Sequence, residues 1–149
     1  MATTPNTMNL SDKTVDVLKQ LARLNIDSAK GFEEISDALG DGYVSQVCNQ
    51  LSAEREQQAR ELSEYVQWSG EEPVTDGSYL AALHRAWLKC REFLSGNDPY
   101  AILKEAEYGE DQIKQAYLEA VDQTAGTAVH PVVLRQYTAV KTAHDRVRD

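Results

Sequence analysis

The stretch "LKQLARLNIDSAKGFEEISDAL", residues 18–39, decides the fold class. Its apolar and small side chains recur alternately three and four positions apart, and this spacing places them along one face of an α-helix. The spacing predicts a helix over about residues 11–39, which "GDG" at 40–42 ends because glycine accepts the left-handed conformation that closes helices. The residues on this face are Leu18, Leu21, Asn25, Ser28, Phe32, Ile35 and Leu39.

The same helical period continues through the rest of the chain, and no alternating strand pattern competes with it. Two residues mark the clearest helix start: Asp98 can accept hydrogen bonds from the first N–H groups, and Pro99 fits the first helical position. A polar, turn-rich stretch, "SGEEPVTDG", occupies residues 69–77. The helices expected after the first one span about residues 43–68, 78–94, 99–123 and 131–149, and the one at 78–94 is short.

The chain therefore reads as an all-α protein with four main helices. Most connections are short and favour antiparallel neighbours, but about 30 residues separate the second main helix from the third. Such a connection permits a crossover, so we expect a ferritin-like four-helix bundle with the short extra helix packed outside it or across one end. An irregular array of five helices is the alternative. Residues 1–149 are expected to form one domain, with residues 1–10 frayed.

Charge argues against two classes of partner. The chain has 24 acidic and 15 basic residues, a formal net charge of -9. Phosphate backbones and anionic membranes repel such a chain, so we expect neither a nucleic-acid nor a membrane partner. The first residues resemble no signal peptide, and no uncharged apolar stretch approaches the roughly 20 residues that span a bilayer.

Two cysteines, Cys48 and Cys90, lie in different expected helices without CxxC spacing. They are expected to be small buried side chains in a reducing cytoplasm, with a disulfide between them as the alternative. A cytoplasmic location is the resulting prediction.

The full metal site of a ferritin-like bundle is missing from the sequence. Such a site takes a Glu from each of two helices and a Glu-x-x-His pair from each of the other two. The chain has three histidines, His84, His130 and His144, and none of them has a Glu three positions before it. A site for iron or manganese made mainly of carboxylates stays open as an alternative to no cofactor. Its candidate ligands are Glu54, Glu107, Glu110 and His144.

Arg55 offers a competing interpretation, since it occupies the middle of the second helix's inner face. A fixed positive charge there disfavours a cation site, and we expect Arg55 to pair with Glu110 across the bundle. The pair would belong to a buried polar layer that fixes the register of the helices. This layer is expected to contain Asn25, Arg55, Gln58, Glu110, Tyr137 and His144, with Ser28 beside them.

The short helix carries "HRAW", which contains the candidate partner-binding residues His84, Arg85 and Trp87. Trp and Arg are common interface anchors. The alternative is that Trp87 packs the short helix onto the bundle while Arg85 stays in solvent. No Gly-rich phosphate loop, G-x-S-x-G elbow or Cys–His motif is present, so no catalytic residue is predicted.

Three stretches carry a family resemblance: "GSYLAALHRAWLKCREFLSGND" (77–98), "EAEYGEDQIKQAYLEAV" (105–121) and "LRQYTAVKTAHDRVR" (134–148). They resemble bacterial ferritin-like four-helix-bundle proteins, grouped as a domain of unknown function and common in proteobacteria and planctomycetes. The likeness implies a ferritin-like fold without the full di-iron ligand set, and no established activity. It marks as motif positions His84, Arg85, Glu107, Glu110, His144 and Asp145. Where family members often have Gly after the His-Arg pair, this chain has Ala86.

Two functions remain. In the first, the protein is a non-enzymatic helical module that acts through self-association or a protein partner, with a stress-related role suggested by analogy to ferritin relatives. In the second, it is a degenerate ferritin-like metalloprotein that binds iron or manganese through bundle carboxylates. The missing Glu-x-x-His pairs and Arg55 favour the first.

Overall fold

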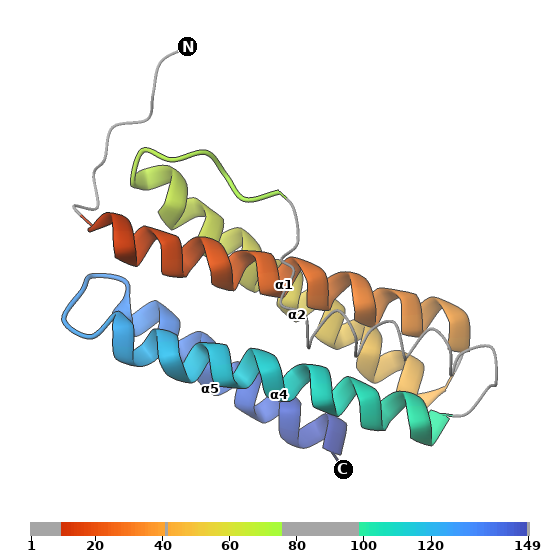
Figure 1. Cartoon of the computed structure of the whole chain (residues 1–149). Helices are drawn as coiled ribbons and strands as arrows, with labels where there is room; N and C mark the ends of the chain where they lie inside the picture. Colours follow the sequence, from red (N-terminus) through yellow and green to blue (C-terminus); the bar gives the residue numbers. More distant parts are fainter. Residues whose placement is uncertain (1–9, 41, 76–98, 149) are drawn as a thin grey trace.

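Four long helices make up the part of the chain that the structure, a computed structural model, describes: residues 10–40, 42–75 and 99–148 (Figure 1). The predicted all-α fold class is confirmed over these ranges, and the element bounds lie close to the expected ones. The helices are α1 (Asp12–Leu39), α2 (Tyr43–Trp68), α4 (Pro99–Gln123) and α5 (His130–Arg148). The expected short helix at 78–94 lies outside the described residues, as do His84, Arg85, Trp87 and Cys90.

Local chemistry explains where α1 begins and ends. The Ser11 hydroxyl accepts a hydrogen bond from the Thr14 backbone N–H at 3.2 Å and so caps the first turn. At the other end Gly40 adopts φ 70°, and its N–H donates to the Ser36 carbonyl. The expected glycine stop is therefore observed, because this conformation is unfavourable for residues with a Cβ.

Contacts between helices fix their directions. The Ser52 hydroxyl of α2 donates to the Ala29 carbonyl of α1 at 2.8 Å, and the Asn25 amide donates to the Tyr117 hydroxyl of α4 at 2.7 Å. α1 runs antiparallel to both α2 and α4, so α2 and α4 run in the same direction (Figure 1). α2 therefore ends and α4 begins at opposite ends of the bundle, which agrees with the expected crossover between them (Figure 1).

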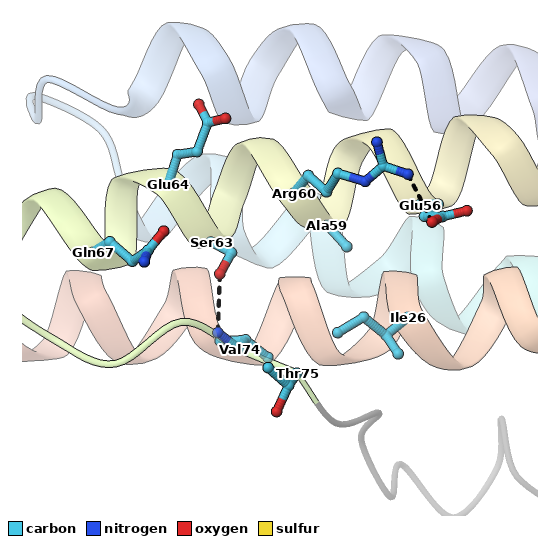
Figure 2. A pocket seen from close by; sticks show the side chains of 9 residues that line it. All are labelled: Ile26, Glu56, Ala59, Arg60, Ser63, Glu64, Gln67, Val74 and Thr75. Atoms are coloured by element: carbon cyan, nitrogen blue, oxygen red, sulfur yellow. Dashed lines mark hydrogen bonds and ion pairs between the residues drawn. The ribbon is translucent and has the colours of Figure 1, made fainter.

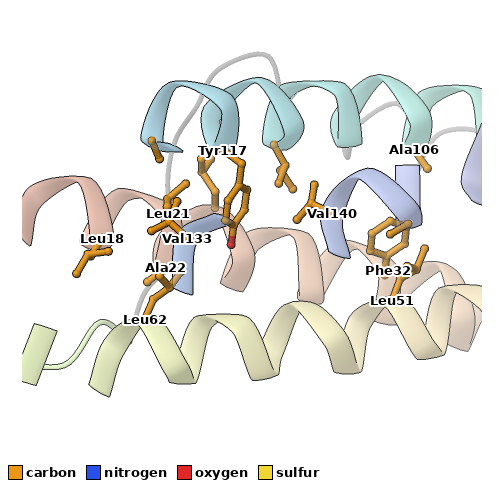
Figure 3. Packing of buried hydrophobic residues seen from close by; sticks show 14 of the residues in the cluster. Leu18, Leu21, Ala22, Phe32, Leu51, Leu62, Ala106, Tyr117, Val133 and Val140 are labelled. Atoms are coloured by element: carbon orange, nitrogen blue, oxygen red, sulfur yellow. The ribbon is translucent and has the colours of Figure 1, made fainter. Parts of the chain in front are cut away.

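The hydrophobic core lies along the axis between the four helices (Figure 3). α1 contributes half of its largest fully buried apolar side chains, and burial of each such side chain stabilises the fold by about 1.5–3 kcal/mol relative to an exposed position. Within the described ranges, no helix has both the length and the apolar character that crossing a bilayer requires. The largest fully buried apolar side chains are Phe32, Leu18, Leu21, Leu24, Ile35, Leu51, Leu62, Ile102, Ile113 and Tyr117.

Candidate functional site

An ion pair lies at the centre of the bundle. Arg55 on α2 extends inward and its Nη2 donates to Oε2 of Glu110 on α4 at 2.8 Å. Both side chains are 0% exposed. The sequence predicts this pairing, but it predicts a half-buried pair, whereas the helices enclose both groups fully. Enclosure matters because a charge without solvent depends entirely on its partner.

Two further side chains contact this pair. Nη1 of Arg55 donates to Oε1 of Gln58 at 3.2 Å, one turn further along the same helix. The Ser28 hydroxyl of α1 lies 3.5 Å from Oε1 of Glu110, at the long limit of a hydrogen bond. Within the described residues, the carboxylate of Glu110 therefore has one strong partner and one weak one.

A second chain of hydrogen bonds crosses the bundle beside the ion pair. Nδ2 of Asn25 donates to the Leu21 carbonyl at 2.8 Å and to the Tyr117 hydroxyl at 2.7 Å. The Tyr117 hydroxyl in turn donates to Oε1 of Gln136 at 2.7 Å, and Nε2 of Gln136 donates to Oε1 of Glu61 at 2.7 Å. This chain connects all four helices through their polar side chains and ends at the partly exposed Glu61.

The observed layer differs from the predicted one on α5. Asn25, Arg55, Gln58 and Glu110 are buried as expected. The prediction for Tyr137 is wrong, because its side chain is half-buried and packs against the edge of the hydrophobic core, while Gln136 is the buried polar residue of α5. Neighbouring residues of a helix point about 100° apart, so a shift of one residue moves a side chain off the inner face. The side chain of His144 lies outside the described part of the chain.

Two neutral groups next to the ion pair have raised pKa values. Burial, helped by the negative charge of Glu110, raises the pKa of the Cys48 thiol to about 12. Burial also raises the pKa of Tyr117, although the hydrogen bond from Asn25 and the charge of Arg55 oppose this. Both groups therefore stay protonated at neutral pH, and Cys48 lacks the thiolate that nucleophilic chemistry needs.

Three of the four candidate metal ligands have side chains that the structure describes, and their surroundings differ. Glu54 is exposed on the outside of α2, Glu107 is half-buried, and Glu110 is enclosed with Arg55. Across the described ranges, no three His, Cys, Asp or Glu side chains are close enough to hold a metal ion together. A guanidinium 2.8 Å from the enclosed carboxylate of Glu110 would also repel a cation, so the candidate ligands among the described side chains do not fit a bundle metal centre.

A partly exposed ion pair joins α2 to α5. Nη2 of Arg135 donates to Oε2 of Glu61 at 2.6 Å, and Gln136 contacts the other oxygen of the same carboxylate. Partial burial acts to raise the pKa of Glu61, but the hydrogen bonds from Arg135 and Gln136 and the charge of Arg135 outweigh it and lower the pKa below its ordinary value.

Among the surface grooves of the described residues are two of different size. The larger one, about 440 Å³, lies beside α1, α2 and the segment 69–75, where the Val74 N–H donates to the Ser63 hydroxyl at 2.9 Å (Figure 2). The second, about 280 Å³, lies between α1 and α4 and has an apolar floor. Neither groove is lined by a His or Cys, and neither shows a nucleophile beside a base. The larger groove is lined by Ile26, Glu56, Ala59, Arg60, Ser63, Glu64, Gln67, Val74 and Thr75.

Several large apolar side chains face the solvent. Tyr108 and Leu118 on α4 and Leu134 on α5 are each between 41% and 45% exposed. At the end of α2, Trp68 is similarly exposed and makes an edge-to-face contact with Tyr65, with ring centroids 5.0 Å apart.

Comparison with known families adds one finding. The sequence pattern of a family described as a "Domain of unknown function (DUF2383)" matches residues 13–123, more than half of the chain. The matched span contains α1, α2 and α4, including Arg55 and Glu110, while α5 follows it. No curated protein matches the chain. The match names no activity, so the function has to be inferred from the bundle itself.

Proposed function

Since the chain belongs to the DUF2383 family, a domain of unknown function, we propose from its geometry that it is a non-enzymatic helical-bundle module that acts by binding a second copy of itself or another protein. The Arg55–Glu110 pair is the observation that carries this proposal. It occupies the centre of the bundle, where a ferritin-like protein would place its metal ligands.

The charges of this pair neutralise one another inside the protein. Arg55 uses two of its nitrogens on Glu110 and Gln58, and both members of the pair are fully enclosed. A substrate would have to open the bundle to reach them. Cys48 and Tyr117, the nearby groups that can titrate, are held in their neutral forms. The polar centre therefore supports the fold and offers no exposed reactive group.

The outer surface supports the binding part of the proposal. Tyr108, Leu118 and Leu134 expose much of their apolar area on α4 and α5, and aromatic residues are enriched at protein interfaces. The candidate anchors His84, Arg85 and Trp87 stay part of the proposal, although they lie outside the described residues. Either surface could bind the partner, and the substitutions given below distinguish between the two surfaces.

A ferritin-like origin and a stress-related role are finer parts of the same proposal. The single crossover between α2 and α4 supports the first, because ferritin-like bundles have one such connection. The stress-related role rests on analogy to ferritin relatives alone, and a fold does not determine a function. A cytoplasmic location is supported by Cys48, a free buried thiol of the kind that reducing compartments preserve.

The alternative function is a metalloprotein that binds iron or manganese through Glu110 and Glu107. One observation favours it: Glu110 is a carboxylate enclosed at the bundle centre. Metal binding would require Arg55 to leave Glu110, and the affinity would then have to exceed the cost of stranding the guanidinium.

Two measurements on the untagged protein test the proposal. After incubation with ferrous iron and manganese and then desalting, elemental mass spectrometry should find less than about a tenth of an ion per chain. Light scattering over a range of concentrations should show a mass that increases with concentration, or crosslinking in cell extract should capture one defined partner. One or two ions per chain, lost in Glu110→Ala but kept in the surface variant Glu119→Ala, would overturn the proposal in favour of the metalloprotein.

Two sets of substitutions locate the binding surface. Leu118→Glu combined with Leu134→Glu places charges on the exposed faces of α4 and α5, whereas Trp87→Ala removes the expected anchor of the 78–94 segment. Loss of association in one set and not in the other assigns the surface. Unchanged association in both would reject both surfaces.

A further inference from the structure

Two enclosed polar atoms of the central layer have no hydrogen-bond partner within the described residues: Oδ1 of Asn25 and Nε of Arg55. Both side chains are 0% exposed. Buried polar atoms almost always have a partner, either in the protein or in ordered water. The two atoms are complementary, because Oδ1 accepts a hydrogen bond and Nε–H donates one.

The orientation of the Asn25 amide is fixed by its surroundings. Its nitrogen donates to the Leu21 carbonyl, so a flipped amide would place two acceptor oxygens against each other. The guanidinium of Arg55 is also fixed, because Nη1 and Nη2 contact Gln58 and Glu110. The orientations of the two side chains are therefore fixed. Oδ1 of Asn25 remains an acceptor, and Nε of Arg55 remains a donor.

The register of α1 and α2 places the two side chains at one level. The Ser52 hydroxyl of α2 contacts the Ala29 carbonyl of α1. About one turn further along α2 is Arg55, and about one turn back along the antiparallel α1 is Asn25. Their hydrogen-bond networks also meet at Gln58, whose side chain accepts from Arg55 and whose carbonyl accepts from Gln136 at 3.4 Å.

We propose that one buried water molecule binds between these atoms, accepting a hydrogen bond from Arg55 Nε–H and donating one to Asn25 Oδ1. Internal waters make about three hydrogen bonds. Oε1 of Glu110 provides the third partner, because its hydrogen bond with Ser28, within the described residues, is long at 3.5 Å. The water thus completes the hydrogen bonding of the ion pair and joins it to the Asn25–Tyr117 network.

Magnetic relaxation dispersion of the water nuclei, which counts long-lived internal waters, tests this site in solution. Asn25→Leu removes the acceptor at similar size, and it should lose one long-lived water per chain relative to the unmodified protein. Thr124→Val is the matched control, because it removes a fully buried hydroxyl that contacts the Ala120 carbonyl near the end of α4. The control should keep the count of the unmodified protein. An equal count in Asn25→Leu and the unmodified protein would overturn the proposal.

A high-resolution crystal structure of the unmodified chain decides the question even where Asn25→Leu fails to fold. The expected result is one water peak within about 2.7–3.2 Å of both Asn25 Oδ1 and Arg55 Nε. A direct hydrogen bond between these two atoms, or no density between them, would contradict the proposal.

Discussion

Two Arg–Glu pairs in this bundle have nearly the same geometry and opposite surroundings. Arg55 and Glu110 are 2.8 Å apart at the centre, with both side chains 0% exposed. Arg135 and Glu61 are 2.6 Å apart on the surface, with the side chains 62% and 28% exposed. The shorter distance belongs to the pair that we expect to matter less for stability.

The difference between the two pairs follows from solvent. Water and salt screen the surface pair, and each of its members regains hydration when the other is removed. At the centre, removing one partner leaves the other charge buried without compensation. Burial, not the N–O distance, therefore decides which pair contributes more to the stability of the fold. The following variants test this order, from the largest expected effect to the smallest.

Replacing Glu110 with Ala should have the largest effect. The change leaves the Arg55 guanidinium enclosed and without its carboxylate, so the free energy of unfolding should fall by about 3–5 kcal/mol. Urea unfolding followed by circular dichroism measures it. Glu119→Ala, an exposed acidic residue on the same helix, should change stability by less than about 0.5 kcal/mol. Equal losses of unfolding free energy in Glu110→Ala and Glu119→Ala would contradict the expected difference between a buried and an exposed charge.

Replacing Tyr117 with Phe should have an intermediate effect. The change removes a hydroxyl that accepts from Asn25 and donates to Gln136, and it leaves buried polar groups without a partner. The expected loss is about 1–3 kcal/mol in the same urea experiment. A neutral result would show that the second hydrogen-bond chain contributes nothing that phenylalanine cannot replace.

Replacing Arg135 with Ala should cost at most about 1 kcal/mol, because the surface pair is largely hydrated. Since salt screens exposed charges, the difference from the unmodified protein should shrink further at about 1 M salt. Urea unfolding at low and high salt measures both. A loss of stability as large as that of Glu110→Ala, and unaffected by salt, would mean that the Arg135–Glu61 ion pair behaves as a buried pair.

Acid should remove the contribution of the Arg135–Glu61 ion pair to stability. The pKa of Glu61 is lowered in the folded protein from its ordinary value of 4.5. A lowered pKa means that the charged form stabilises the fold above pH 4.5, and this stabilisation is lost as the pH falls through the folded pKa. The stability difference between the unmodified protein and Glu61→Gln should therefore be present at neutral pH and disappear in acid. A difference that grows below pH 4.5 would contradict the assignment.

Most of the fold could be predicted from the sequence because its signals are local. The inner face of α1 follows one helical period, Gly40 requires a positive φ, and Pro99 begins α4. The direction of α4 followed from the length of the connection before it. The sequence also left open where the helix expected at 78–94 would pack, and these residues lie outside the described ranges.

The central site was predictable only in part. Arg55 and Glu110 occupy inner positions of their helices, so opposite charges were expected to meet there. On α5 the adjacent Val132 and Val133 are both buried, so the helical period alone does not distinguish a face that contains Tyr137 from one that contains Gln136. The role of the Tyr117 hydroxyl depends on contacts between helices, and a single helix pattern does not contain them.

The central claim is that the bundle core is a closed ion pair whose members depend on each other. A double-mutant cycle with Arg55→Leu, Glu110→Leu and the combined variant tests it most directly, with urea unfolding as the readout. We predict that each single change costs about 3–5 kcal/mol, whereas the combined variant, with no stranded charge, loses far less than the sum. Losses that simply add, or a Glu110→Leu variant as stable as the unmodified protein, would contradict the account.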